Sequence, residues 1–167
     1  MTDTPAAAPP VPPETIDATY LVVVDDTPEG RVALRYAALR AAHVGARLTL
    51  LHVIAKTEFM AFGGVQATIE AETQAAADTL LSGVAAQCEA WTGARPSLIV
   101  RRGAATTAVL EVLAADRAIR ALVLGAAVKG APGPLVTFFA GERAGSLPCL
   151  VMIVPGGLNE ARLGALA

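Results

Sequence analysis

Short apolar runs alternate with longer amphipathic segments along most of the chain. The first run, residues 20–24, is unbroken and rich in valine, as in strands covered on both faces. Thr27 and Pro28 then occupy positions typical of a helix N-cap and first turn, and Gly45 is a plausible C-terminal stop. The pattern therefore predicts a strand followed by a helix.

A second strand and a long helix come next. Residues 47–54 predict the strand, residues 59–64 an irregular connection, and a stripe of apolar side chains the helix, which ends at 93–96. The stripe consists of Leu80, Val84, Cys88 and Trp91. The remaining predicted elements are a strand at 97–100, a helix at 106–116, a strand at 121–124, a helix at 134–145 and a strand at 149–154.

This alternation of strands and helices is typical of an α/β fold with a parallel sheet, right-handed crossovers and helices on both faces. Periodicity alone does not determine the strand order. Residues 1–18 are rich in proline and alanine, which predicts a disordered tail. We expect one α/β domain over residues 19–156 and a C-terminal tail over 157–167.

Composition narrows the range of functions. The residues are 54% hydrophobic but only 4% aromatic, so the core must consist mainly of alanine, valine and leucine. A net charge of -2 argues against a nucleic-acid partner. Mean hydropathy is +0.53, yet no apolar run approaches the roughly 20 residues of a membrane span. We expect a cytoplasmic protein with no membrane partner.

Two acidic residues follow the first predicted strand. In open parallel sheets, ligands bind beyond the carboxyl ends of the strands, where the strand order reverses. Asp25 therefore has two interpretations, as a helix cap and as a ligand contact, whereas Asp26 fits a structural role better. The loop after this strand is one candidate binding element.

The loop after the strand at 121–124 is the other candidate. It contains Gly125, Gly130 and Gly133, which permit close backbone approach, and Lys129, which can place a charge beside a phosphate. Thr137, in the helix that follows, completes the candidate set. A plain glycine-proline connector is the alternative, and no Walker motif is present.

The remaining reactive residue types do not form a catalytic pattern. His43 and His52 lie within predicted elements without a neighbouring nucleophile, and both are expected to be structural. Cys88 and Cys149 are far apart, with no nearby ligands at metal spacing. Neither a disulfide framework nor a zinc site is expected, and we predict no catalytic residues.

Three stretches together resemble the universal stress protein family. They are residues 20–26 with the helix that follows, the segment Leu-Leu-His-Val-Ile at 50–54, and residues 121–125 with the glycine loop and the closing segment 147–151. The resemblance covers residues 19–155. It implies a doubly wound five-stranded parallel sheet of order 3-2-1-4-5, similar to the adenine-nucleotide alpha-hydrolase fold. Members are commonly dimers, and one branch binds ATP or AMP.

The resemblance also implies roles for particular residues. Asp25 matches an aspartate near the adenosine, and Val53 matches a residue that contacts the base. The branch that binds nucleotides has glycine, two residues, glycine, nine residues, then glycine and a hydroxyl residue. Gly125 fits the first position, but direct counting reaches Val128 and Phe138 for the other two glycines.

An alternative alignment with an insertion in the loop uses Gly130 and Gly141 as the later glycines of this motif. It then places Glu142 where the hydroxyl residue belongs. Asp26 also replaces the family's usual glycine. Both carboxylates would repel a phosphate unless a cation intervened.

Several hypotheses follow for the function. The leading one is a homodimeric stress-response or regulatory domain that binds ATP or AMP, with or without Mg²⁺, or another small anion. The dimer is expected to form through an uncharged edge strand, which would otherwise be open to pairing. This strand consists of Leu150, Val151, Met152, Ile153 and Val154. The alternatives are a protein-interaction module that binds no nucleotide and a slow Mg²⁺-dependent ATPase.

Overall fold

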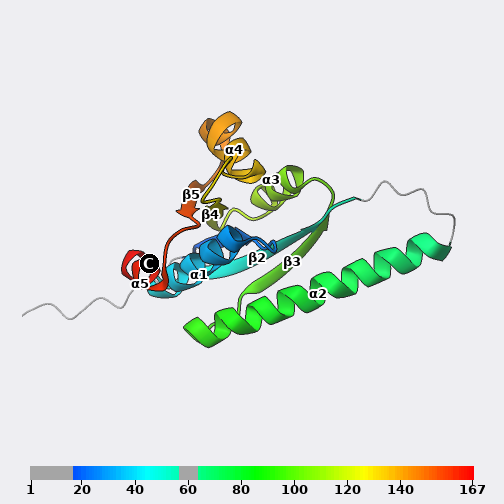
Figure 1. Cartoon of the computed structure of the whole chain (residues 1–167), viewed down its shortest axis with the longest axis horizontal. Helices are drawn as coiled ribbons and strands as arrows, with labels where there is room; N and C mark the ends of the chain where they lie inside the picture. The colour runs from blue at the N-terminus through cyan, green and yellow to red at the C-terminus, as the bar shows by residue number, and fades with distance from the viewer. Residues whose placement is uncertain (1–16, 57–63) are drawn as a thin grey trace, which may run out of the picture.

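Five parallel strands form one sheet in the order β3-β2-β1-β4-β5 (Figure 1). The computed structural model describes residues 17–56 and 64–167. The strands are β1 (Thr19–Val23), β2 (Arg47–Ile54), β3 (Ser97–Arg102), β4 (Ile119–Ala126) and β5 (Leu150–Pro155). The doubly wound fold and the order implied by the family resemblance are confirmed.

Helices cover both faces of the sheet. They are α1 (Pro28–His43), α2 (Gly64–Thr92), α3 (Ala105–Ala115), α4 (Pro134–Thr137) and α5 (Glu160–Leu166). α1, α2 and α5 pack in one core cluster, and α3 and α4 pack in the other. The α2 helix also extends well past the sheet (Figure 1). Among the described residues, no helix is both long and apolar enough to span a bilayer.

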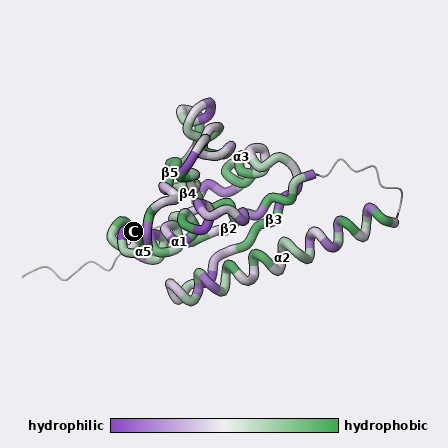
Figure 2. Tube along the Cα trace, viewed as in Figure 1, coloured by the Kyte–Doolittle hydropathy of each residue, from purple (hydrophilic) through white to green (hydrophobic). Residues whose placement is uncertain are grey.

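The alternation of side chains along each strand divides the core into two layers. Val22 and Leu50 point toward α1 and α2, whereas Leu21 and Leu51 point toward α3, and all four are fully buried or nearly so. Hydrophobic residues accordingly concentrate along the strands, while α2 alternates between hydrophobic and hydrophilic positions (Figure 2). A sheet buried on both faces explains the unbroken apolar run at the start of the domain.

Small residues let α1 lie close to the centre of the sheet. Its buried face consists largely of alanine, with Ala33, Ala37, Ala38 and Ala41 each at most 2% exposed. The alanine-rich composition thus produces a thin interface between helix and sheet. The position of α1 matters for function because its first turn lies beside the carboxyl ends of β1 and β4.

The single helix predicted at residues 134–145 is wrong in its details. Only α4 is α-helical, and a π-helical turn over Phe138–Glu142 and a 3₁₀ turn over Ala144–Ser146 follow it. The N–H of Arg143 donates to the carbonyl of Phe138, five residues earlier. Gly141 and Gly145 disfavour a regular helix over this stretch, because glycine loses the most backbone entropy on folding.

The segment expected as a C-terminal tail contains a packed helix. Asn159 caps α5 by accepting the N–H of Arg162 at 2.9 Å, and Leu163 is 2% exposed in the core cluster of α1 and α2. One buried leucine among small and polar residues is too weak a pattern to predict such a helix. Residues 1–16 of the predicted tail, and 59–63 of the predicted connection, lie outside the described residues.

Neither cysteine lies at the carboxyl end of a strand. Cys88 is fully buried between α2 and the sheet, and this burial raises the pKa of its thiol from 9.0 to about 11. Burial also raises the pKa of Cys149, although a hydrogen bond with the Leu122 backbone opposes the effect. Neither thiol is therefore poised to act as a nucleophile.

The Cys88 pKa predicts a change in stability at alkaline pH. In the unfolded chain this thiol ionises near pH 9, whereas in the folded protein it stays protonated until about pH 11. The stability that this shift contributes, about 3 kcal/mol, is fully present below pH 9 and is lost as the pH rises from 9 through 11.

Urea unfolding at a series of pH values, for the wild type and Cys88→Ala, measures this difference. The stability of the variant is expected to fall less steeply between pH 9 and 11. Comparing the two proteins removes the contribution of other groups that titrate in this range. Parallel curves would contradict the proposed effect of burial.

Candidate functional site

The main candidate site is a cavity of about 240 Å³ at the carboxyl ends of β1 and β4. The order of the sheet reverses at this pair, because β2 follows on one side of it and β5 on the other. Its wall comes from the ends of β1, β2 and β4, the first turns of α1, α3 and α4, and the loop before α4. This is where ligands bind in open α/β sheets, although the volume lies slightly below the roughly 300–1,000 Å³ typical of small-molecule sites.

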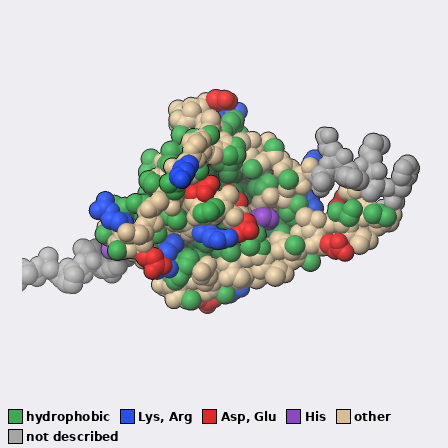
Figure 3. Space-filling model, viewed as in Figure 1, with side chains coloured by type: hydrophobic (Ala, Val, Ile, Leu, Met, Phe, Trp, Pro, Cys, Tyr) green, Lys and Arg blue, Asp and Glu red, His purple; other side chains and the backbone are tan. Residues whose placement is uncertain are grey.

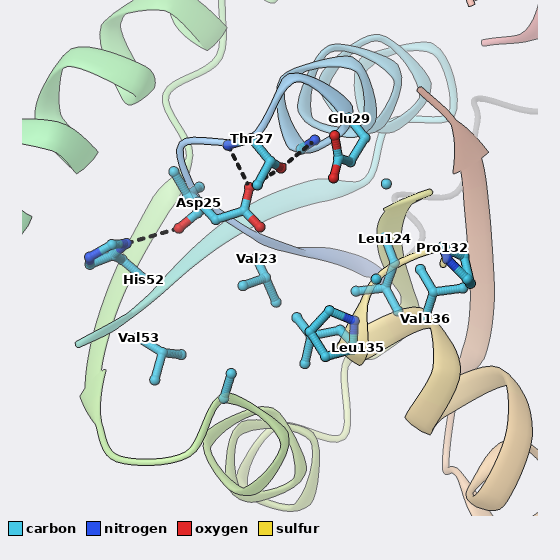
Figure 4. Close-up of a pocket in the computed structure, with 16 residues that line it drawn as sticks. Val23, Asp25, Thr27, Glu29, His52, Val53, Leu124, Pro132, Leu135 and Val136 are labelled. Carbon is cyan, nitrogen blue, oxygen red and sulfur yellow. Dashed lines mark hydrogen bonds between the residues drawn. The ribbon is translucent and has the colours of Figure 1, made fainter. Parts of the chain in front are cut away.

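A hydrogen-bonded turn shapes the side of the cavity nearest α1. Asp25 Oδ1 accepts the hydroxyl of Thr27 at 2.6 Å and its backbone N–H at 3.2 Å. The Thr27 oxygen in turn accepts the N–H of Gly30 at 3.0 Å (Figure 4). Asp25 thus orients the residue that caps α1, and a cap of this kind contributes about 0.5–2 kcal/mol.

Glycines bring the first turn of α1 against the strand ends. A Cβ atom at Gly125 would overlap the carbonyl of Glu29, and one at Gly30 would overlap the Asp25 carboxylate. Gly156, directly after β5, has the same restriction, because its Cβ would meet the side chain of Glu29. A larger residue at Gly125 or Gly156 would push α1 away from the sheet, and one at Gly30 would displace the Asp25 carboxylate.

His52 lies at the edge of the cavity, near the end of β2. Its Nδ1 lies 2.8 Å from the carbonyl oxygen of Val24, so this nitrogen donates to the backbone in the neutral ring. The bond connects β2 to the segment that follows β1, as the structural role expected for His52 requires. The ring nevertheless lines the cavity as well.

The remainder of the wall is mostly apolar. Val23 and Val53 lie on one side of the opening, and Leu124, Leu135 and Val136 lie on another (Figure 4). The two phenylalanines of the π-helical turn pack into the α3 side of the core instead of lining the cavity. The site therefore offers an apolar wall opposite the carboxylates of the α1 turn.

Four of the residues predicted from the sequence lie together in this wall. They are Asp25, Val53, Gly125 and Gly133. They come from three strand ends and from the loop before α4. They line the same cavity because the sheet order places these strand ends side by side. Gly133 has a φ of 114°, a backbone conformation that favours glycine.

The other four predicted residues lie outside the wall. Asp26 pairs instead with Arg31 at 2.5 Å, and its side chain is 85% exposed. Lys129 and Gly130 lie on the exposed outer part of the glycine loop, where Gly130 has a φ of 78°. Thr137 donates its hydroxyl to the Gly133 carbonyl, four residues earlier, at 3.0 Å, so this hydroxyl is used within its own helix.

Sequence reasoning missed several wall residues. Glu29 follows the predicted cap by two positions, and a helical first turn beside a strand end was a signal that could have identified it. Ala105, at the start of α3, carries no such signal. It enters the site only because β3 lies at the far edge of the sheet and its crossover returns to β4.

The chemistry of this wall suits binding better than turnover. Its ionisable side chains are Asp25, Glu29 and His52, and the His52 ring is bonded to the main chain. Hydroxyl or amine groups of a ligand can donate to the carboxylates, while a flat apolar group can lie on the valines and leucines. In the described part of the chain, no three histidine, cysteine or acidic side chains are grouped as metal ligands.

Comparison with protein families identifies one matching model. It is described as the universal stress protein family and matches residues 19–155. The match includes all five strands and excludes α5. No match is found among the curated proteins.

Solved structures with the same description share the fold. Universal stress protein UspA from Lactobacillus plantarum superposes with a TM-score of 0.66 at 18% identity, covering 82% of this chain and 97% of that one. A family protein from Burkholderia pseudomallei gives 0.60 at 17% identity, with 86% and 99% covered. A universal stress protein in complex with cAMP gives 0.59 at 16% identity, with 82% and 96% covered.

The contact between α1 and β4 leads to a stability prediction. Gly125→Ala should lower the free energy of unfolding by about 1–3 kcal/mol, because the added methyl overlaps the Glu29 carbonyl. Gly83→Ala is the matched control, since this position lies inside α2 with open space around it. That substitution should stabilise the protein by about 0.5–1 kcal/mol. Chemical denaturation measures the free energy of unfolding of both variants. Equal changes for Gly125→Ala and Gly83→Ala would contradict the close contact.

Proposed function

The chain belongs to the universal stress protein family, and from this membership we propose a cytoplasmic stress-response regulatory domain that binds the adenosine part of an adenine nucleotide such as AMP or ATP. The domain acts as a homodimer in this proposal. The observation that carries the ligand proposal is the cavity between β1 and β4, with Asp25 and Val53 in its wall. These two residues match the positions implied by the family resemblance.

The shape and polarity of the wall support an adenosine-like ligand. A purine ring is flat and largely apolar, and Val23, Val53 and Leu135 offer surfaces of the same kind. The hydroxyls of a ribose are hydrogen-bond donors, and Asp25 Oδ2 accepts no bond from the residues that the structure describes. A fold relative bound to cAMP adds support, although at 16% identity it shares only the fold.

Filling the cavity tests this ligand proposal. Val53→Trp should weaken the binding of adenosine, AMP and ATP by about tenfold or more, because an indole occupies the space beside the apolar wall. Leu98→Trp on β3 is the control, since this side chain is 39% exposed and lies outside the wall. Isothermal titration calorimetry with each compound gives the affinities. If none of the three compounds binds the wild type saturably, the proposed function is wrong.

The proposed dimer uses the edge strand β5. Leu150 is 72% exposed and Ile153 44% exposed, and the strand carries no charged side chain. Tyr36, Met152 and Leu166 extend this apolar surface toward α1 and α5. An exposed edge of this composition pairs readily with another strand, and a second subunit would cover it.

The opposite edge of the sheet has a different character. There, β3 ends in Arg101 and Arg102, both exposed, and charged side chains discourage edge pairing. Arg102 also donates to the Glu70 carbonyl and to Gln74, so α2 covers this end of the edge. The contrast supports β5 as the edge where the dimer forms.

A lysine on β5 tests the dimer. Ile153→Lys should shift the protein from dimer to monomer, because it places a charge at the centre of the proposed interface. Val65→Lys is the matched control, since Val65 is 59% exposed at the start of α2. Native mass spectrometry of both variants and the wild type gives the subunit count. A monomeric wild type, or a dimer that survives Ile153→Lys, would contradict the interface.

A further inference from the structure

The cavity lacks basic side chains. The chain has 13 lysines and arginines, and residues 1–16 and 57–63 contain none of them. All 13 therefore lie in the described parts of the chain, and none lines the cavity wall. A site that holds a polyphosphate ordinarily supplies lysine or arginine to balance its charge.

Nearby basic groups are occupied or directed elsewhere. Arg31 follows the α1 turn but pairs with Asp26. The guanidinium of Arg143 lies over the ring of Phe138, 5.9 Å from its centre. Lys129 lies on the exposed part of the glycine loop. A hydrogen bond from the Ala127 N–H to the Pro132 carbonyl, 3.2 Å long, closes this loop.

Several backbone groups in and after the glycine loop offer no donor to the cavity. Pro134, the first residue of α4, has no N–H, and the N–H of Thr137 donates to the Gly133 carbonyl. The N–H of Ala127 is likewise used within the loop. Pro134 and these bonds reduce the backbone donors on this side of the cavity to a few N–H groups, such as those of Leu135 and Val136 at the start of α4.

Negative charge instead comes from the wall itself. Asp25 and Glu29 both line the cavity on its α1 side, with their carboxylates above the apolar wall (Figure 4). On the face seen in Figure 3, acidic and basic side chains and a histidine lie close together at the centre of the molecule. Both carboxylates lie on the side of the cavity nearest the start of α1. They repel phosphate groups and attract hydroxyl donors.

We propose that this cavity selects an uncharged nucleoside such as adenosine over the corresponding triphosphate. The inference rests on the proposed function, since it concerns the ligand class of the same site. The apolar wall binds the base, the carboxylates of Asp25 and Glu29 bind the ribose hydroxyls, and the missing cations leave a triphosphate without a counter-charge. ATP binds well only where a divalent cation neutralises its phosphates.

Calorimetric titrations with adenosine and ATP test this preference, with EDTA present to remove divalent cations. ATP should bind about tenfold or more weakly than adenosine. The difference between the ATP and adenosine affinities should become smaller at high NaCl, because salt screens the repulsion between the phosphates and the carboxylates. Glu29→Gln should reduce the ratio of adenosine affinity to ATP affinity by about threefold, because it removes one charge that repels the phosphates.

Two control variants separate this local effect from general changes in charge. Glu111→Gln makes the same charge change on α3, at an exposed position outside the wall, and should leave the ratio of the two affinities unchanged. Lys129→Gln should also leave ATP binding unchanged, whereas a phosphate contact by Lys129 would make it weaker.

The outcomes distinguish the two proposals. Adenosine that binds more tightly than ATP, with the difference reduced in Glu29→Gln, supports the charge selection. The proposed preference for adenosine is wrong if ATP binds more tightly than adenosine without divalent cations, or if ATP binding depends on Lys129. The proposal that the cavity binds a nucleotide stands in both cases. If neither compound binds, both proposals are wrong.

Discussion

The structure depends on the close contact between the first turn of α1 and the end of β4. Gly125 provides the space for the Glu29 backbone, and Gly30 provides the space for the Asp25 carboxylate. The chain can therefore turn from β1 into a capped helix directly beside a neighbouring strand. The cavity exists because this turn and the crossover after β4 leave on opposite sides of the sheet.

The fold was largely predictable from the pattern of apolar residues. Runs such as residues 20–24 are long enough to be strands yet too short to be helices, and they alternate with amphipathic segments. Strand order came from the family resemblance, because periodicity carries no information about which strands are neighbours. Local regularity was harder to predict: Gly141 and Gly145 are a weak local signal for the break at Phe138, and the packing of Leu163 depends on tertiary contacts that a single segment does not reveal.

The site was predictable in position more than in chemistry. Asp25 and Gly125 were identified because they follow strands that meet where the sheet order reverses. The neighbouring glycines suggested that Lys129 lies near a phosphate. Whether the side chain of a loop residue points inward, however, depends on the path of the backbone. Glu29 was overlooked because an acidic residue in a first helical turn is ordinary on its own. Its importance comes from Gly156 and Gly125, which are distant in sequence.

The position of Gly156 has a consequence for communication across the domain. Its N–H donates to the Ala126 carbonyl at 2.8 Å, and it leaves no room for a side chain beside Glu29. One residue thus joins the end of the outermost strand to the helix turn that bears an acidic wall group. If two subunits associate along that strand and binding in the cavity shifts this junction, cavity occupancy and subunit affinity alter each other by an equal factor.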